Sequence, residues 1–210
     1  MPAKRVLVIL VIIAIIGAGL FIVLQNKQPP TPAELLKAEQ EVYTALLLYQ
    51  KGTYSSEYVY GTVIDKHQLI EYTNSGELQG NTPMDSAGYH GDFDIEKFPD
   101  LQQKTWTDYQ EKNKVSYPIK EFLPSTADVV LVNPANGEQL YWWVSFSRIG
   151  FNSSLTQALV LVGDCRGELC YNDAGVFMYS QGFYVFLQKK YGKWIIKDRQ
   201  DAWFIESPSP

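Results

Sequence analysis

A stretch of polar side chains between Ser147 and Asp164 is the part of this sequence best suited to chemistry. We call this stretch the polar island; it contains the candidate binding residues Arg148, Asn152, Thr156, Gln157 and Asp164, with Ser147 beside them. An arginine and a carboxylate with neighbouring hydroxyl and amide groups could line a small pocket for an anion or another hydrogen-bonding ligand. The polar island is therefore our candidate binding site.

The polar island also has a purely structural interpretation, which we favour. Buried polar groups are almost always hydrogen bonded, so Arg148 would pair with a carboxylate and Asn152 would cap a turn. Thr156 and Gln157 would then project from the sheet.

A nucleophilic serine would need a neighbouring base, and the sequence offers little support for one. The two histidines, His67 and His90, both fall in expected turns or loops, and the sequence has no Gly-x-Ser-x-Gly elbow. We therefore predict no catalytic residues. The alternative is a membrane-anchored, hydrolase-like enzyme that uses the polar island from Ser147 to Gln157 together with a loop carboxylate.

His90, Asp92 and Asp94 form a weak candidate for a metal site. The alternating spacing lets both aspartates point the same way, so they could bind Ca²⁺ or Zn²⁺ beside the imidazole. The twelve-residue calcium loop with its closing glutamate is missing, which favours a solvated turn. We predict no metal and no cofactor.

The two cysteines, Cys165 and Cys170, are predicted to form a disulfide bond. Closing so short a loop contributes about 2 kcal/mol, enough to fix a turn but not to hold a fold together. A redox motif would have two intervening residues, and a zinc site would need more ligands.

The tryptophans and one asparagine give two further candidates. Trp142, Trp143, Trp194 and Trp203 could stack on a carbohydrate or an apolar ligand, but neighbours in a strand face opposite sides, so at least one of Trp142 and Trp143 should be core. Asn152-Ser153-Ser154 is a glycosylation sequon, relevant only in a host that glycosylates secreted chains.

An uninterrupted apolar run of 19 residues, from Val6 to Leu24, predicts a transmembrane signal-anchor helix that contacts membrane lipid. At 1.5 Å per residue the run spans about 28 Å, close to the thickness of a bilayer's hydrocarbon core. A cleaved signal peptide is the competing hypothesis, but its apolar core is shorter and ends in a small-residue cleavage site, which Val23 to Lys27 does not offer.

The charges on either side of this run predict its orientation. Lys4 and Arg5 precede it and only Lys27 follows closely, so residues 1–5 are expected in the cytoplasm and the domain outside. The linker, residues 25–30, reaches at most about 20 Å. Residues 31–206 form the expected extracytoplasmic domain, and residues 207–210 a frayed tail.

The domain is acidic. All 23 acidic residues follow residue 33, whereas three of the 18 basic residues precede it, so the domain carries 15 − 23 = −8 charges. An acidic surface repels phosphate backbones, so nucleic acid is not an expected partner.

The local patterns predict an α+β domain in which an antiparallel sheet is covered by two helices. A capping box, Thr31-Pro32-Ala33-Glu34, predicts a helix to about Gly52, packed on the sheet or, alternatively, on a second copy. A second helix is expected over 100–114. Runs rich in β-branched and aromatic residues predict strands at 58–64, 68–72, 129–132, 140–152, 155–163, 182–189, 194–197 and 203–205, with a long loop over 74–98. Tyr191-Gly192-Lys193 predicts a hairpin between the strands on either side of it, because glycine can take the positive φ of a tight turn.

The order of several short motifs resembles a set of uncharacterised proteins that are often secreted or membrane-anchored. The motifs lie at 104–113, Ser147-Arg148-Ile149-Gly150-Phe151-Asn152, 156–163, Gly167-Glu168-Leu169-Cys170 and Gly192-Lys193-Trp194. The resemblance covers about residues 100 to 205 and implies no activity or ligand. The stretch 171–175 departs from the glycine-rich turn that commonly follows the cysteines in that set.

The sequence therefore predicts a single-pass membrane protein with a non-catalytic binding or envelope-associated domain. Its partner, an unknown protein or small-molecule ligand, is not indicated by any motif.

Overall fold

The computed structural model describes residues 29–54, 67–73, 88–90, 93–127, 129–132, 142–166 and 179–206. The chain divides into two compact units, residues 1–30 and residues 31–210, and nearly all described residues belong to the second. The expected transmembrane helix, residues 6–24, lies outside the described residues and stays a prediction. Among the described helices, none combines the length and the apolar character needed to span a bilayer.

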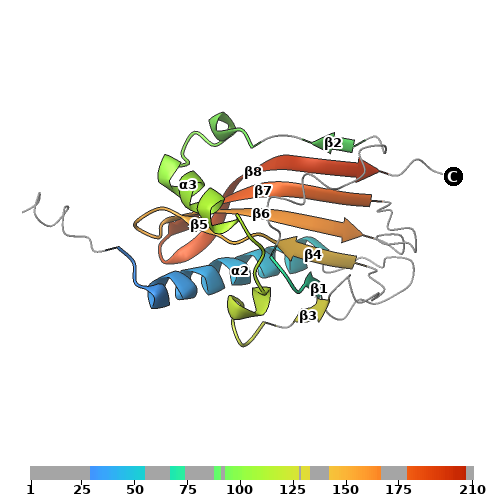
Figure 1. The fold of residues 1–210 in the computed structure, drawn as a ribbon, viewed down its shortest axis with the longest axis horizontal. Coiled ribbons are helices and arrows are strands. Elements are labelled where there is room, and N and C mark those ends of the chain that lie inside the picture. Colours follow the sequence, from blue (N-terminus) through green and yellow to red (C-terminus); the bar gives the residue numbers. More distant parts are fainter. Residues whose placement is uncertain are drawn as a thin grey trace, which may run out of the picture. The chain divides into compact units, whose positions relative to one another are not determined.

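The second unit is an α+β domain built on one sheet of eight strands (Figure 1). The strand order is β2-β8-β7-β6-β4-β1-β3, and β5 pairs with β6. The strands are β1 (His67–Ile70), β2 (Gly88–His90), β3 (Val129–Val132), β4 (Trp142–Phe146), β5 (Gly150–Phe151), β6 (Gln157–Arg166), β7 (Tyr179–Lys190) and β8 (Lys193–Glu206).

The sheet is mostly antiparallel but mixed, which corrects the purely antiparallel prediction. Strand β1 runs parallel to both of its neighbours, β3 and β4. Parallel neighbours need a long crossover connection, and residues 71–128, which include a helix, connect β1 to β3. The strand expected at 58–64 lies outside the described residues.

Helix α2 (Pro32–Tyr54) begins at the predicted capping box. The Thr31 backbone N–H donates to Glu34 Oε2 at 2.8 Å, and the Glu34 backbone N–H donates to Thr31 Oγ1 at 3.3 Å. These reciprocal bonds satisfy two N–H groups that the helix itself leaves without partners. The start of α2 is therefore specified locally.

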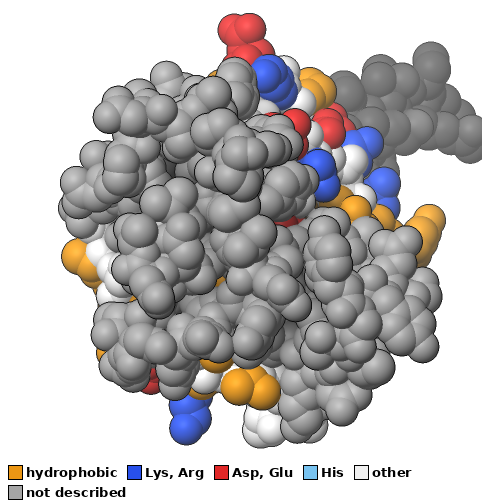
Figure 2. Space-filling model, turned by 90° about the vertical axis from the view of Figure 1, so that its right-hand side faces the viewer, with side chains coloured by type: hydrophobic (Ala, Val, Ile, Leu, Met, Phe, Trp, Pro, Cys, Tyr) orange, Lys and Arg blue, Asp and Glu red, His pale blue; other side chains and the backbone are white. Residues whose placement is uncertain are grey.

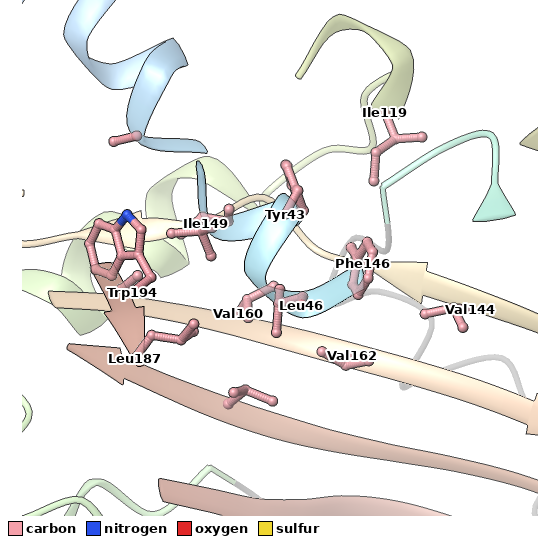
Figure 3. Close-up of a cluster of buried hydrophobic side chains, with 14 of the residues drawn as sticks. Tyr43, Leu46, Ile119, Val144, Phe146, Ile149, Val160, Val162, Leu187 and Trp194 are labelled. Carbon is pink, nitrogen blue, oxygen red and sulfur yellow. The ribbon is translucent and has the colours of Figure 1, made fainter. Parts of the chain in front are cut away.

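The buried side of α2 packs on one face of the sheet (Figure 3). Its side chains Val42, Tyr43 and Leu46 meet Val160 and Val162 of β6 in one apolar cluster, the α2 core. Alternate residues of a strand face opposite sides, so this face of β6 carries the even-numbered residues. The stripe on α2 thus packs within the domain, as predicted.

Helix α3 (Gln103–Lys112) packs on the opposite face. Tyr109 of α3 clusters with Leu159 and Leu161, which are the odd-numbered residues of β6. Gly150 of β5 permits the contact, because a Cβ atom there would lie 2.5 Å from the Tyr109 backbone nitrogen and 2.6 Å from the Thr105 carbonyl oxygen. The two expected helices therefore cover opposite faces of the sheet.

The expected long loop, 74–98, contains ordered elements among its described residues. Strand β2 extends the sheet beside β8, and a short 3₁₀ helix, η2 (Ile95–Lys97), follows it. The Phe93 ring stacks on Trp106 with centroids 4.0 Å apart, and Phe98 is buried against Phe186. Two phenylalanines therefore fix the end of this segment on the α3 face.

Strands β7 and β8 form a hairpin through Tyr191 and Gly192, as predicted. The strands expected at 194–197 and 203–205 form one continuous strand, β8, because irregular pairing at Gly182/Phe183 and Phe186/Leu187 lets it stay paired with β7 along its length.

A second 3₁₀ helix, η3 (Ile119–Glu121), places Ile119 in the α2 core.

Candidate functional site

Most of the polar island lies in the connections that lead from β4 through β5 into β6, whereas Gln157 and Asp164 belong to β6 itself. Ser147 to Ile149 link β4 to β5, and Asn152 to Thr156 link β5 to β6. One side of this segment faces α2 and the other faces α3, since Phe151 belongs to the α2 core and Gly150 contacts α3. Polar side chains of these connections can therefore bond to either helix.

Arg148 is held by α2. Its Nε and Nη2 atoms donate to the same oxygen, Oε1 of Glu39, at 3.0 and 2.9 Å. The guanidinium also stacks on Phe122, 3.7 Å from the ring centroid, and lies 5.1 Å from that of Tyr117. The side chains of Arg148 and Glu39 are only 14% and 3% exposed, so this is a buried ion pair.

Burial has a measurable consequence for Glu39. Removal from water raises the pKa of its carboxyl group, and this effect outweighs the attraction of Arg148 and Lys112, which act to lower it. The repulsion of Asp108 adds to the rise. The cost of removing charged groups from water commonly exceeds the attraction between the partners of a buried ion pair.

Ser147 is fully buried and hydrogen bonded. Its hydroxyl donates to the Arg148 carbonyl at 3.0 Å and accepts from the Leu161 backbone N–H at 2.8 Å. Its carbonyl accepts from the Tyr43 hydroxyl of α2 at 2.8 Å. Burial also raises the pKa of Tyr109, whose hydroxyl bonds to Ser147 from the α3 side. Ser147 thus bridges the two helices and is shielded from any substrate.

Helix α3 fixes the backbone of the island through three side chains near its end. Asn113 accepts from the Arg148 backbone N–H at 2.8 Å and donates to the Arg148 carbonyl at 2.9 Å. Lys112 Nζ donates to the Ile149 carbonyl at 3.0 Å, and Asp108 accepts from the Phe151 N–H at 2.7 Å. Lys112 and Asp108 also pair with each other at 2.9 Å.

Asn152 closes the turn into β6, in agreement with the structural interpretation. Its Oδ1 accepts from the backbone N–H groups of Thr156 and Gln157 at 2.8 and 3.1 Å. Its Nδ2 donates to Gln102 Oε1 at 3.2 Å and to Thr156 Oγ1 at 3.0 Å. Asn152, the asparagine of the glycosylation sequon, is only 2% exposed. Its amide nitrogen is therefore not accessible for glycosylation in the folded chain.

Gln157 is buried and does not project from the sheet into solvent. Its Oε1 accepts from the Gln102 backbone N–H at 2.9 Å and from Thr105 Oγ1 at 3.2 Å. Its Nε2 donates to the Asp100 carbonyl at 2.7 Å. Gln157 therefore caps the start of α3, a task that Gln102 itself, at the N-cap position, does not perform with its side chain.

The structure does not bring Asp164 to Arg148. Asp164 lies opposite Val144 and Gln181 in the sheet, and Gln181 Nε2 donates to its Oδ1 at 3.2 Å. The carboxylate that Arg148 binds is Glu39, 109 residues away in the chain. Sequence reasoning missed Glu39, although its place on the apolar side of α2, one residue after Ala38 and three before Val42, was a usable signal.

The other sequence candidates fall largely outside the described residues. Asp94 accepts from the Glu96 backbone N–H as the N-cap of η2, whereas the His90 side chain and Asp92 lie outside. The Cys165 backbone is part of β6, but its side chain and Cys170 also lie outside, so the disulfide stays a prediction. Among the side chains that are described, no three His, Cys, Asp or Glu residues are grouped to hold a metal ion.

Two of the tryptophans considered for ligand stacking are buried. Trp194 lies in the α2 core, where its Nε1 donates to Glu41 Oε2 at 3.2 Å, and Trp143 is buried in β4. The side chains of Trp142 and Trp203 lie outside the described residues. A stacking surface formed by Trp143 and Trp194 therefore has no support.

Comparisons of the chain with models of protein families, with curated proteins and with solved structures found no match. The function must therefore be argued from this geometry. The polar island ties α2 and α3 to the sheet, and its role as a binding site stays a prediction.

Proposed function

We propose that the protein is a single-pass membrane protein whose domain, residues 31–206, lies outside the membrane and works by binding a partner or supporting an envelope assembly. It is not expected to catalyse a reaction. The apolar run from Val6 to Leu24 and the charges around it support the anchor.

The observation that carries the non-catalytic part is the use of the polar island for internal bonding. Ser147 is fully buried between two bonds, Arg148 is bound to Glu39, and Asn152 uses both of its polar atoms in the turn. A catalytic group must reach the reacting atoms of a substrate, which these side chains cannot do without unfolding the helix contacts. This internal bonding argues against Ser147 as the nucleophile of the hydrolase alternative.

Fractionation of cells that produce the full chain would test the anchor. An anchored chain stays with the membranes after alkaline carbonate extraction and keeps its full mass, and an impermeant reagent labels its domain from outside. A chain that is shortened and released into the soluble fraction would contradict the proposal.

Variants of the full chain would test the absence of catalysis. Ser147→Ala removes the hydroxyl at the start of the island, the nucleophile tested here, and Ser154→Ala, at an exposed serine in the turn, is the matched control. Hydrolysis of ester, phosphoester or glycoside substrates that Ser147→Ala abolishes and Ser154→Ala retains would establish the hydrolase alternative, provided that both variants keep the folded fluorescence spectrum.

A further inference from the structure

The turn between β7 and β8 presents an aromatic side chain that the fold itself does not use. Tyr191 and Gly192 form a two-residue loop with φ angles of 52° and 78°. This left-handed geometry is typical of a type I′ hairpin turn, in which asparagine followed by glycine is the preferred pair. Tyr191 is fully exposed, so no packing contact compensates for its place at a position that disfavours bulky residues.

Two lysines flank this tyrosine on an otherwise acidic domain. Lys190 and Lys193 are paired across the hairpin and both are exposed. Among the described residues neither ammonium group has an ion-pair partner, whereas the preceding Lys189 is bound to Glu41 at 2.6 Å. The turn therefore carries two positive charges that no described carboxylate neutralises, although the domain as a whole carries −8.

The turn lies at the end of the domain where the chain enters from the linker. Lys189 and Trp194, on either side of the turn, both contact Glu41, which is nine residues, or about 14 Å, from the first residue of α2. In Figure 1 the start of α2 and the β7–β8 turn lie at the same end of the sheet. Figure 2 views the domain from the opposite side, where the described acidic and basic side chains are interspersed.

We propose that the tip of the β7–β8 hairpin, Lys190 to Lys193, rests on a membrane surface that contains anionic lipids. Tyr191 would lie among the headgroups, where tyrosine is favoured, and the lysines would bind lipid phosphates. This inference rests on the proposed anchor, because a linker of six residues holds this end of the domain within about 20 Å of the bilayer.

The test uses the full chain reconstituted into vesicles of phosphatidylcholine alone or of phosphatidylcholine mixed equally with phosphatidylglycerol. A membrane-impermeant reagent acetylates exposed lysines, and mass spectrometry follows Lys190 and Lys193. Lys120 of η3 is the internal control, because the neighbouring Ile119 bonds to Glu71 directly after β1, which lies four strands, or about 19 Å, across the sheet from β8. We expect the acetylation rates of Lys190 and Lys193, relative to Lys120, to fall about fivefold on the anionic vesicles and to recover in high salt.

Tyr191→Asn separates membrane contact from folding. Asparagine suits the turn geometry, so the variant should melt at the same temperature or higher, yet the two lysines should lose part of their protection. Leu48→Gln, which removes an exposed apolar side chain farther along α2, is the matched control and should change nothing.

The possible failures are distinguishable. A chain that does not float with the vesicles contradicts the anchor and the hairpin contact together. A chain that floats but shows equal acetylation on both vesicle types contradicts the hairpin contact alone. A lower melting temperature for Tyr191→Asn would also overturn it, because Tyr191 would then have a folding role.

Discussion

Replacing Arg148 by methionine is expected to leave a buried carboxylate without its cation and to make the stability of the domain strongly dependent on pH. In the wild-type chain two guanidinium nitrogens bind Glu39 Oε1 at 3.0 and 2.9 Å, and Glu39 is only 3% exposed. Methionine has the length to replace the contact of Arg148 with Phe122 but cannot donate a hydrogen bond. The loss therefore falls mainly on Glu39.

The size of this loss in stability depends on the protonation state of Glu39 in the variant. The carboxylate can stay charged and desolvated, or it can take up a proton. For a carboxyl group with a pKa of 4.5 in the unfolded chain, protonation at pH 7 costs about 3.4 kcal/mol, and this cost is the upper limit of the electrostatic loss. With the lost hydrogen bonds added, we expect the free energy of unfolding to fall by about 3–5 kcal/mol at pH 7.

The sign of the pH dependence follows from the same raised pKa. A carboxyl group whose pKa is higher in the folded than in the unfolded chain stabilises the folded state at pH values below its unfolded pKa. This contribution is lost as the pH rises through its folded pKa. The Arg148→Met variant should therefore recover on acidification. At pH 5 protonation costs only about 0.7 kcal/mol, so the deficit should shrink to about 1–2 kcal/mol.

Urea denaturation of the full chain in detergent micelles measures this deficit. All five tryptophans lie after residue 100, so their fluorescence reports on the domain alone. Glu39→Gln alone should also cost about 3–5 kcal/mol, because it leaves the buried guanidinium of Arg148 without its anion. In the Arg148→Met background the same change should restore most of the loss at pH 7 and remove the pH dependence.

The control is the exposed pair of Lys114 and Glu111, whose atoms are 2.7 Å apart. Lys114→Met should change stability by less than about 0.5 kcal/mol, equally at both pH values. An equal deficit of Arg148→Met at pH 5 and pH 7 would show that the loss does not fall on Glu39. Losses of Glu39→Gln and Arg148→Met that simply add in the double variant would contradict a coupled ion pair.

Three further outcomes follow from local geometry. Gly150→Ala should lower the free energy of unfolding by about 2–3 kcal/mol or more, because the new Cβ would lie 2.5 Å from the Tyr109 backbone nitrogen. A loss below about 0.5 kcal/mol in urea denaturation would show that α3 can shift freely. The folded chain should carry no glycan at Asn152 even when incubated with an oligosaccharyltransferase, and an intact-mass increase that peptide mapping places there would contradict its burial. Thr31→Ala should cost about 1 kcal/mol by removing the cap of α2, and Ser153→Ala, in an exposed turn, should cost almost nothing in the same assay.

The sequence signals that succeeded are those that act within a few residues. The capping box at Thr31 sets the start of α2, and the glycine after Tyr191 marks the hairpin. The parallel pairing of β1 carries no such local mark, because it depends on a crossover of more than fifty residues that brings β3 back beside it. Alternating or continuous apolar runs predict that a strand exists, but they leave its partner and direction open.

The polar island shows the same limit for a site. Local reasoning predicted that Arg148 would bind a carboxylate and that Asn152 would close a turn, and both occur. The choice of Glu39, and the bonds that Asn113 makes to the Arg148 backbone, join segments far apart in the chain. Such partners follow from how α2 and α3 are placed on the sheet, which the residues around Arg148 do not specify.

The internal use of the polar island changes where recognition should be sought. Buried groups that are already paired, such as Arg148 and Asn152, would have to break those bonds before they could bind a ligand, at a cost of several kcal/mol. Exposed groups without partners carry no such cost. Tyr191, Lys190 and Lys193 are exposed and have no partner among the described residues, and they lie at the end of the domain where α2 begins. A partner or surface that approaches this end of the domain would therefore meet this turn without disturbing the island.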